Sequence, residues 1–150
     1  MIKTVSSMLK GKDPGIWSIE PNNTVFEALT LMAEKKCGAL LVLENEKLCG
    51  IISERDYARK IILVGKSSKE TLIKEIMTST VFYASPELTA EECMAIMIEK
   101  KVRHLPVLDN ENLIGVISIG DVVKAVIDEK VFVIDQLERY ITGRPNLWFI

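Results

Sequence analysis

Two short stretches of the sequence place a serine three residues before an aspartate, at the start of a helical pattern. They are Gly50–Asp56 (GIISERD) and Gly115–Asp121 (GVISIGD), and each contains the end of an apolar run too short for a helix. A helix N-terminus offers free N–H groups to a phosphate, and a carboxylate accepts hydrogen bonds from both hydroxyls of a ribose. The chemistry that these stretches would support is nucleotide binding, with the aspartates facing the sugar.

The same spacing also has a purely structural interpretation. Ser53 and Ser118 would be N-cap residues, and Asp56 and Asp121 would lie at the third helical position, near the positive end of the helix dipole. This arrangement needs no ligand. The motif by itself therefore leaves both interpretations open.

An internal repeat relates the two motifs. When the sequence is shifted by 65 residues, 18 of the 44 residues from 19 to 62 are identical to their counterparts. Pro21 aligns with Pro86, and the motif serines and aspartates align with each other. The chain is therefore a tandem duplication of one structural unit.

Each repeat predicts the same order of elements, and hence an α+β fold. A T-x-x-E capping box at Thr24 and at Thr89 begins a helix. Two short apolar strands around a polar turn then form a β-hairpin, and a second helix follows over residues 53–63 and 118–128. With a short opening strand, each unit is β-α-β-β-α.

The repeat divides the chain into five segments. Residues 1–15 are a lead-in that could hold a helix over 5–9, and residues 66–79 are a linker with a helical turn near 72–77. The two repeat units occupy residues 16–65 and 80–130. Residues 131–150 are expected to form a helix and an apolar tail, which would dock on its own fold or on a partner chain.

Composition excludes several classes of protein. The chain is 48% hydrophobic and 27% charged with a net charge of −2, which argues against disorder and against a dedicated nucleic-acid binder. It has neither an apolar run of the roughly 18 residues that span a membrane nor a secretory hydrophobic segment at its start. Three cysteines without a CxxC pair exclude a disulfide framework and a cysteine-rich zinc site, and indicate a reduced, cytoplasmic protein.

The sequence shows no catalytic motif. It contains no G-x-S-x-G, P-loop, HExxH or GxGxxG pattern, and its cysteines have no basic partner nearby in the sequence. We therefore expect no enzymatic activity, no catalytic residue, no catalytic cofactor and no metal site.

The repeat, with a hydrophobic-x-x-Ser-x-x-Asp segment closing each hairpin, resembles the cystathionine-β-synthase (CBS) domain pair over about residues 14–130. The segments SERDYAR, RHLPV, SIGDVVK and YITG are similar to those of free-standing bacterial CBS-pair proteins. The resemblance implies a Bateman module, in which two tandem β-α-β-β-α units are related by pseudo-two-fold symmetry and usually form a dimer. It also implies clefts that bind adenosyl ligands: AMP, ADP, ATP, S-adenosylmethionine or a dinucleotide such as NAD.

The resemblance implies two ligand sites, in which the aspartate holds the ribose and the base lies between the opening strand and the first hairpin strand. The first site would comprise Ile16, Ser18, Ile19, Gly38, Ala39, Leu40, Ile52, Ser53, Arg55 and Asp56. The second would comprise Thr78, Val81, Tyr83, Arg103, His104, Leu105, Pro106, Ile117, Ser118, Gly120 and Asp121. The apolar members could equally be core residues, and several could be both.

The repeats differ where the ligand would be selected. Gly38-Ala39 in the first repeat aligns with Arg103-His104 in the second, so the first slit is expected to be roomier and to accept ATP or a dinucleotide. The cations of the second favour a monophosphate, and Gly120 lets a ligand approach the backbone. Arg55 and Arg103 either bind phosphate or are solvated, and a lone histidine such as His104 is either a structural residue or a ligand contact.

These observations favour a cytoplasmic, homodimeric adenine-nucleotide sensor that signals to a partner protein by changing its conformation. One alternative is a protein–protein adaptor whose clefts are vestigial. A weaker alternative is nucleic-acid binding through the clefts, against which the mild acidity of the chain argues.

Overall fold

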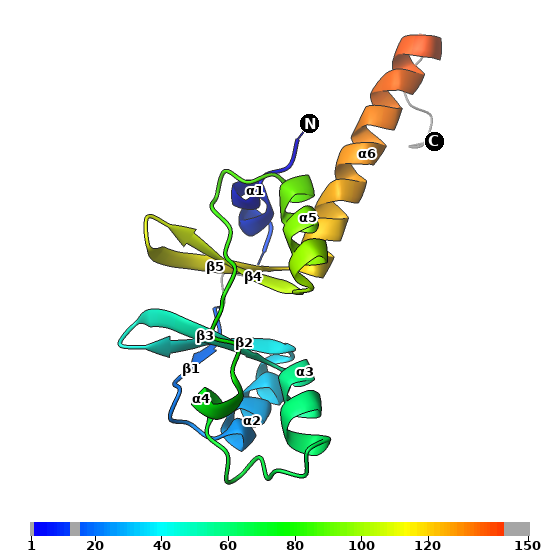
Figure 1. The fold of residues 1–150 in the computed structure, drawn as a ribbon. Coiled ribbons are helices and arrows are strands. Elements are labelled where there is room, and N and C mark those ends of the chain that lie inside the picture. The colour runs from blue at the N-terminus through cyan, green and yellow to red at the C-terminus, as the bar shows by residue number, and fades with distance from the viewer. Residues whose placement is uncertain (1, 13–15, 143–150) are drawn as a thin grey trace. The chain divides into compact units, whose positions relative to one another are not determined.

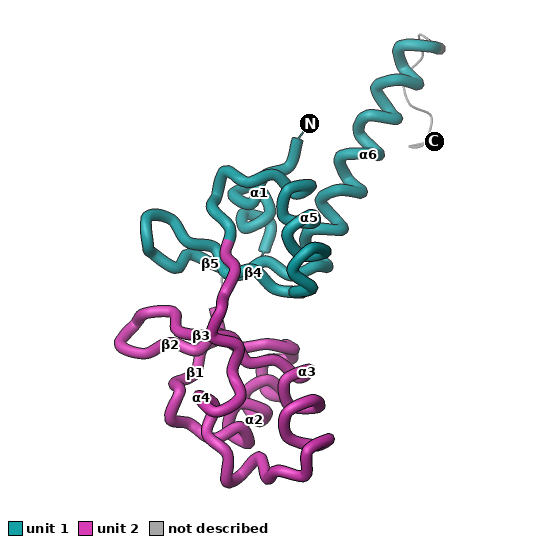
Figure 2. Tube along the Cα trace, viewed as in Figure 1, with its two compact units in different colours: residues 1–14, 84–150 teal, residues 15–83 magenta. Residues whose placement is uncertain are grey.

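The computed structural model describes residues 2–12 and 16–142, so the expected apolar tail at 143–150 lies outside the described residues. The chain divides into two compact units. Unit 1 combines Met1–Pro14 with Ala84–Ile150, and unit 2 is Gly15–Tyr83 (Figure 2). Unit 1 therefore holds the second sequence repeat and unit 2 holds the first.

Unit 2 has a three-stranded sheet in the order β1-β2-β3, with β1 parallel to β2 and β2 antiparallel to β3 (Figure 1). Its elements are β1 (Ser18–Ile19), α2 (Val25–Lys35), β2 (Ala39–Glu44), β3 (Lys47–Ser53), α3 (Glu54–Tyr57), the π-helix η1 (Ala58–Ile62) and α4 (Ile73–Ile76). The helix predicted over 53–63 is present, but it changes from α to π geometry after its first turn. The order of elements confirms the predicted α+β unit.

Unit 1 repeats this order with a two-stranded sheet, β4-β5. Its elements are α1 (Val5–Lys10), α5 (Ala90–Lys100), β4 (His104–Asp109), β5 (Asn112–Ser118) and α6 (Ile119–Thr142). The expected opening strand is reduced to a single parallel bridge between Ala84 and Val107. The helices predicted over 118–128 and from 131 onward form one continuous helix, α6. Neither α6 nor any other helix in the described ranges is long and apolar enough to cross a membrane.

The local signals in the sequence produce the expected turns and caps. Asn45-Glu46 and Asn110-Glu111 all have positive φ, which is the geometry of the two-residue turns that match the twist of a hairpin. Thr89 forms the complete reciprocal capping box. At Thr24 only half of the box is present, because its side chain accepts from Glu27 N–H while the Glu27 carboxylate accepts from the Asn23 amide.

The short helices α1 and α4 occupy equivalent places in the two units. Val5 N–H donates to the Leu88 carbonyl at 2.8 Å, and Ile73 N–H donates to the Asn23 carbonyl at 2.9 Å; Leu88 and Asn23 are counterparts in the repeat. Val5 and Ile73 are both completely buried. Each short helix therefore closes the core of a unit by its apolar side chains.

The segments outside the two repeats pack as parts of the compact units, so the unit boundaries differ from the segment boundaries expected from the sequence. The segment 66–79, expected to be a linker, lies in unit 2 together with residues 80–83, and its Ile73 and Ile76 join the core of that unit. The lead-in at 1–14 lies in unit 1. The reason is physical: both segments carry large apolar residues that find a buried place only against a repeat unit.

Candidate functional site

The Ser53–Asp56 motif of unit 2 lies where β3 ends and α3 begins. Ser53 N–H donates to Oδ2 of Asp56 at 2.9 Å, and Asp56 N–H donates to Oγ of Ser53 at 3.3 Å. The Ser53 hydroxyl also donates to the same carboxylate oxygen at 3.1 Å. The motif is thus a reciprocal helix cap, as the structural interpretation of its spacing requires.

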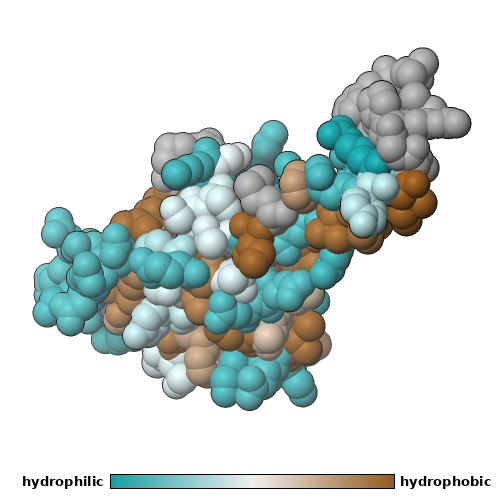
Figure 3. Space-filling view, turned by 90° about the horizontal axis from the view of Figure 1, so that it is seen from above, coloured by the Kyte–Doolittle hydropathy of each residue, from teal (hydrophilic) through white to brown (hydrophobic). Residues whose placement is uncertain are grey.

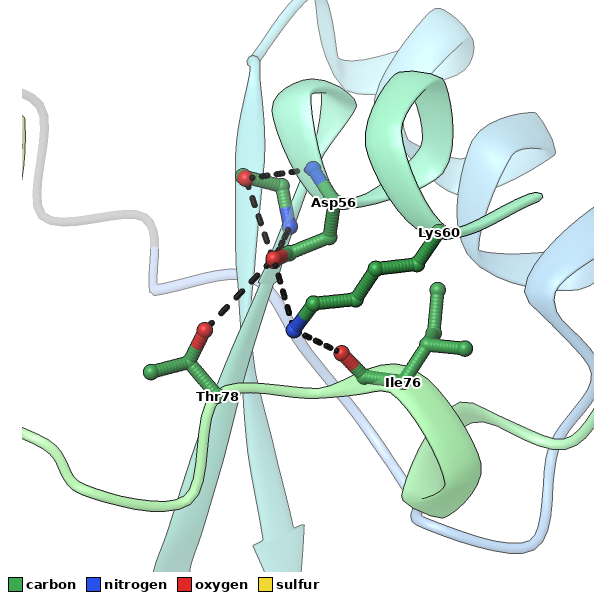
Figure 4. A network of polar contacts seen from close by, with 5 residues as sticks. Asp56, Lys60, Ile76 and Thr78 are labelled. Atoms are coloured by element: carbon green, nitrogen blue, oxygen red, sulfur yellow. Dashed lines mark hydrogen bonds and ion pairs between the residues drawn. The ribbon is translucent and has the colours of Figure 1, made fainter. Parts of the chain in front are cut away.

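The other oxygen of Asp56 is also engaged (Figure 4). Its Oδ1 accepts from the Thr78 hydroxyl at 3.5 Å and pairs with Nζ of Lys60 at 3.3 Å, and Lys60 in turn donates to the Ile76 carbonyl at 2.7 Å. Only 13% of the Asp56 side chain is exposed. Asp56 therefore ties the start of α3 to the segment that follows α4. Thr78, which we expected in the second site, contacts the aspartate of the first.

In unit 1, the Ser118–Asp121 motif forms the same cap. Ser118 N–H donates to Oδ2 of Asp121 at 2.8 Å, and Asp121 N–H donates to Oγ of Ser118 at 3.2 Å. Nζ of Lys12 lies 2.7 Å from the same Oδ2 and 2.7 Å from the Val116 carbonyl. The Asp121 side chain is 29% exposed, about twice as much as that of Asp56. The second motif is therefore the more open of the two.

The ionisation of Asp121 follows from these contacts. Burial acts to raise the pKa of its carboxyl, but the hydrogen bonds from Lys12 and Ser118, with the charge of Lys12, outweigh it and hold the pKa below its usual value. The carboxylate is therefore charged at neutral pH and can accept hydrogen bonds from a ligand. No local pattern in the sequence indicates Lys12, because 109 residues separate it from Asp121.

The hairpins close over the starts of α3 and α6 in the same way. Glu54 N–H donates to the Gly38 carbonyl at 3.0 Å, and Ile119 N–H donates to the Arg103 carbonyl at 2.9 Å. These bonds use the N–H of the first helical residue, and the N–H of the third donates to the motif serine. The N–H of the second helical residue takes part in neither contact, and in α6 that residue is Gly120. A ligand at the start of α6 would meet this donor with no side chain in the way.

Charge distinguishes the two sites. His104 lies opposite Ser118 in the β4–β5 register, and Lys12, Arg103 and Asp121 all act on its ionisation. Burial and then the charge of Lys12 lower the pKa of His104, with Arg103 adding to the effect and Asp121 opposing it. The cations beside His104 are therefore Arg103 and Lys12, whereas the lowered pKa leaves His104 itself mostly neutral at neutral pH.

At the first hairpin the charge is opposite. Ala39, the counterpart of His104, lies opposite Ser53 in the β2–β3 register. A Cβ built on Gly38 would lie 3.9 Å from the Glu54 carboxylate, so an acidic side chain borders this position. The open space expected at Gly38-Ala39 therefore has an anionic neighbour, which disfavours a phosphate there.

The remaining expected site residues divide between core and surface. Leu40, Ile52, Leu105, Pro106 and Ile117 are fully buried, as their alternative role in the core requires. Ile16, Ile19, Arg55 and Val81 are partly buried, whereas Ser18, Tyr83, Arg103 and Gly120 are exposed. Thr78, Val81 and Tyr83 belong to unit 2, and the other residues of the expected second site belong to unit 1. The structure therefore brings together residues 103–106 and 117–121 of that site.

The lowered pKa of His104 predicts how stability depends on pH. Because the folded state binds this proton less readily than the unfolded state, the free energy of unfolding should rise with pH from below the lowered pKa up to the ordinary value of 6.5. The slope for one proton is at most about 1.4 kcal/mol per pH unit. His104→Gln should flatten it in urea unfolding between about pH 5 and 7. His104 is the chain's single histidine, so equal slopes in both proteins would contradict the burial of this ring.

Comparison with known proteins identifies the family. The sequence profile of the CBS domain matches residues 12–63 and 73–128. The mitochondrial CBS domain-containing protein CBSX3 of Arabidopsis thaliana is 39% identical over 149 residues, which cover 93% of this chain and 72% of that protein. The chain therefore belongs to the CBS-domain family as a tandem pair, a regulatory module, which confirms the resemblance read from the sequence.

Solved structures of CBS-domain proteins support the same family assignment. A CBS-domain protein from Burkholderia ambifaria MC40-6 is 50% identical, with a TM-score of 0.82 over 84% of this chain and 95% of that one. The CBS pair of protein MJ0100 shares the fold at 23% identity and a TM-score of 0.73, over 86% of this chain and 99% of that one. That pair was solved in complex with 5′-methylthioadenosine and S-adenosyl-L-methionine.

Proposed function

We propose that this CBS pair is a sensor of adenine nucleotides such as AMP, ADP, ATP or NAD. The observation that carries the proposal is the group around Asp121: a charged, part-exposed carboxylate at a helix start, beside Lys12, Arg103 and His104. The carboxylate can accept both hydroxyls of a ribose, while the cations and the Gly120 N–H attract its phosphate. The adenosyl ligands of the MJ0100 pair support this class of ligand.

The apolar residues of the hairpin complete the proposed site. Leu105 and Ile117 are register partners at the base of the β4–β5 hairpin, directly beside the His104–Ser118 pair. Their side chains are fully buried, and the backbone N–H and C=O groups of this apolar pair are the kind of donors and acceptors that would bind the edge of an adenine base. The corresponding site in unit 2 would use Asp56, Leu40 and Ile52 in the same roles.

We propose that the module works without catalysis and without a metal or catalytic cofactor. The described residues hold no cluster of histidine, cysteine and acidic side chains that could bind a metal ion. Burial, reinforced by Glu92, raises the pKa of Cys93 to about 11, so this thiol is a poor nucleophile. Three free thiols also suit a reducing compartment such as the cytoplasm.

A homodimer is part of the proposal, and the surface of α6 supports it. Large apolar side chains remain exposed along this helix between its hydrophilic ones (Figure 3). They include Val123, Ile127, Ile134, Leu137 and Ile141. Exposed apolar stripes of this kind mark interaction surfaces, and we propose that nucleotide binding alters how this helix meets a second copy or a regulated partner protein.

The exposed face of α6 also favours the alternative of a protein adaptor with vestigial clefts. The two functions differ in one measurable property, the affinity for nucleotides. An adaptor of this kind would bind its partner with the clefts empty. Membrane insertion and nucleic-acid binding are not part of either proposal.

Mass spectrometry of the natively purified full chain tests the proposal. We expect dimers that retain an adenine nucleotide, and calorimetry on stripped protein should show binding of AMP, ATP or NAD. Protein that carries no ligand, together with no heat of binding for all three at millimolar concentrations, would favour the adaptor instead.

A further inference from the structure

Lys12 stands at the end of a segment that is held at both ends by α6. At one end, the backbone N–H of Lys3 donates to the buried carboxylate of Glu129. At the other, Nζ of Lys12 pairs with Asp121. Between them Leu9 packs against Gly115 of β5, so closely that a Cβ on Gly115 would lie 2.7 Å from its side chain. The backbone that carries Lys12 is therefore fixed against the site of unit 1.

We infer that Lys12 is the residue that makes the second site selective for a phosphorylated ligand. The inference rests on the proposed function and assigns a role within it. A ribose that binds Asp121 must share the carboxylate with the Lys12 ammonium, which lies 2.7 Å from Oδ2. A nucleoside offers this ammonium no new anion, whereas the phosphate of a nucleotide does, through a charge-assisted hydrogen bond.

The position of Lys12 supports this role. Its side chain is 34% exposed, so the ammonium can turn toward a ligand without leaving the protein surface. Its second contact, the Val116 carbonyl at 2.7 Å, is a neutral acceptor that a phosphate can replace. Arg103 and His104 act on the same neighbourhood from the hairpin. Lys12 and Arg103 thus bring two positive charges to the surroundings of the single Asp121 carboxylate, an excess of positive charge that a phosphate would balance.

In unit 2 the lysine beside the motif aspartate is Lys60, which comes from the helix that the motif begins and donates to the Ile76 carbonyl, not to the end of β3. Equivalence of α1 with α4 places Thr80 where unit 1 has Lys12. The Ile51 carbonyl, counterpart of that of Val116, accepts instead from the backbone N–H of Thr78 at 2.9 Å. Glu54 borders the first hairpin where unit 1 has its cations. Recognition of phosphate is therefore assigned to the second site, which also argues against the expectation that the first site takes the longer, more highly charged ligands.

Calorimetry with AMP and adenosine on the full-length chain tests the inference. Lys12→Gln should weaken AMP binding by about 10-fold or more, the value of one charge-assisted hydrogen bond, and leave adenosine binding within about 2-fold. Lys10→Gln makes the same change of charge two residues away, on an exposed side chain of the same segment, and should change neither affinity. Lys12→Arg keeps the charge and should preserve the preference for AMP, which also serves as the test if the glutamine variant does not fold.

The possible results separate the inference from the proposed function. If Lys12→Gln weakens AMP and adenosine equally, or changes neither, Lys12 has only a structural role and the inference is wrong while nucleotide sensing stands. The same holds if the wild type binds AMP no better than adenosine. If the wild type binds neither compound, nor ATP or NAD, both the inference and the proposed function are wrong.

Discussion

Replacing Asp121 with asparagine should weaken AMP binding at the second site by about 10- to 150-fold, which corresponds to the 1.5–3 kcal/mol of a hydrogen bond to a charged group. Asparagine keeps an oxygen that can accept the Ser118 N–H, so the cap at the start of α6 should survive. The change removes the negative charge that would bind the ribose hydroxyls and that holds Lys12. Calorimetry with AMP on wild type and variant measures the effect.

The matched control is Asp128→Asn, which makes the same substitution at an exposed position of the same helix. It should leave the affinity within about 2-fold of the wild type. Asp56→Asn should affect only the first site, and less strongly, because both oxygens of that carboxylate already have partners within the protein. Unchanged binding of AMP, ATP and NAD in the Asp56→Asn, Asp121→Asn double variant would show that neither aspartate holds the ribose.

The capping and ligand-binding interpretations of the motif are compatible at Asp121. The contacts of its carboxylate that define the cap and the ion pair both fall on Oδ2. A carboxylate has about four acceptor positions on its two oxygens, so a ribose can bind while the cap remains. At Asp56 the contacts are spread over both oxygens, and a ligand would have to displace Thr78 or Lys60. The free-energy cost of binding a ligand is therefore expected to be lower at Asp121 than at Asp56.

The parts of the fold that the sequence predicts correctly are those fixed by neighbouring residues. The caps at Thr24 and Thr89, the turn at Asn45-Glu46 and the periodicity of α2 and α5 depend on contacts within a few positions. The ungapped repeat then transfers each element from one half to the other. The cap at Ser53 is one of the two interpretations that the Ser-x-x-Asp spacing allows.

What the sequence did not predict depends on contacts between distant segments. The equivalence of α1 and α4 has an offset of 68 residues, since Val5 matches Ile73, whereas the repeat has an offset of 65. The ungapped alignment at a shift of 65 therefore does not reveal it. The ion pair of Lys12 with Asp121 depends on the packing of α1 in unit 1, and no local pattern near either residue indicates this ion pair. The pattern V-x-x-M-L against I-x-x-I-M is the signal that could have shown the equivalence.

Shortening Ile73 to alanine should therefore destabilise the protein strongly. The side chain is completely buried and belongs to the core of unit 2, and removing a buried isoleucine down to its Cβ costs about 2–5 kcal/mol through lost burial and the cavity left behind. For a chain of this size the thermal midpoint should fall by roughly 5–15 °C. Scanning calorimetry of wild type and variant measures the shift.

Ile98→Ala provides the control, because it makes the same chemical change on α5 where the side chain is 68% exposed. Surface substitutions of this kind usually change stability by less than about 0.5 kcal/mol. A segment that merely links the two repeats would give Ile73→Ala the same small effect, and that result would show that α4 is not part of the core. A large effect means that the buried side chain of Ile73 holds the segment that carries Thr78 in place. Ile73 then also stabilises the contact between Thr78, five residues further on, and Asp56.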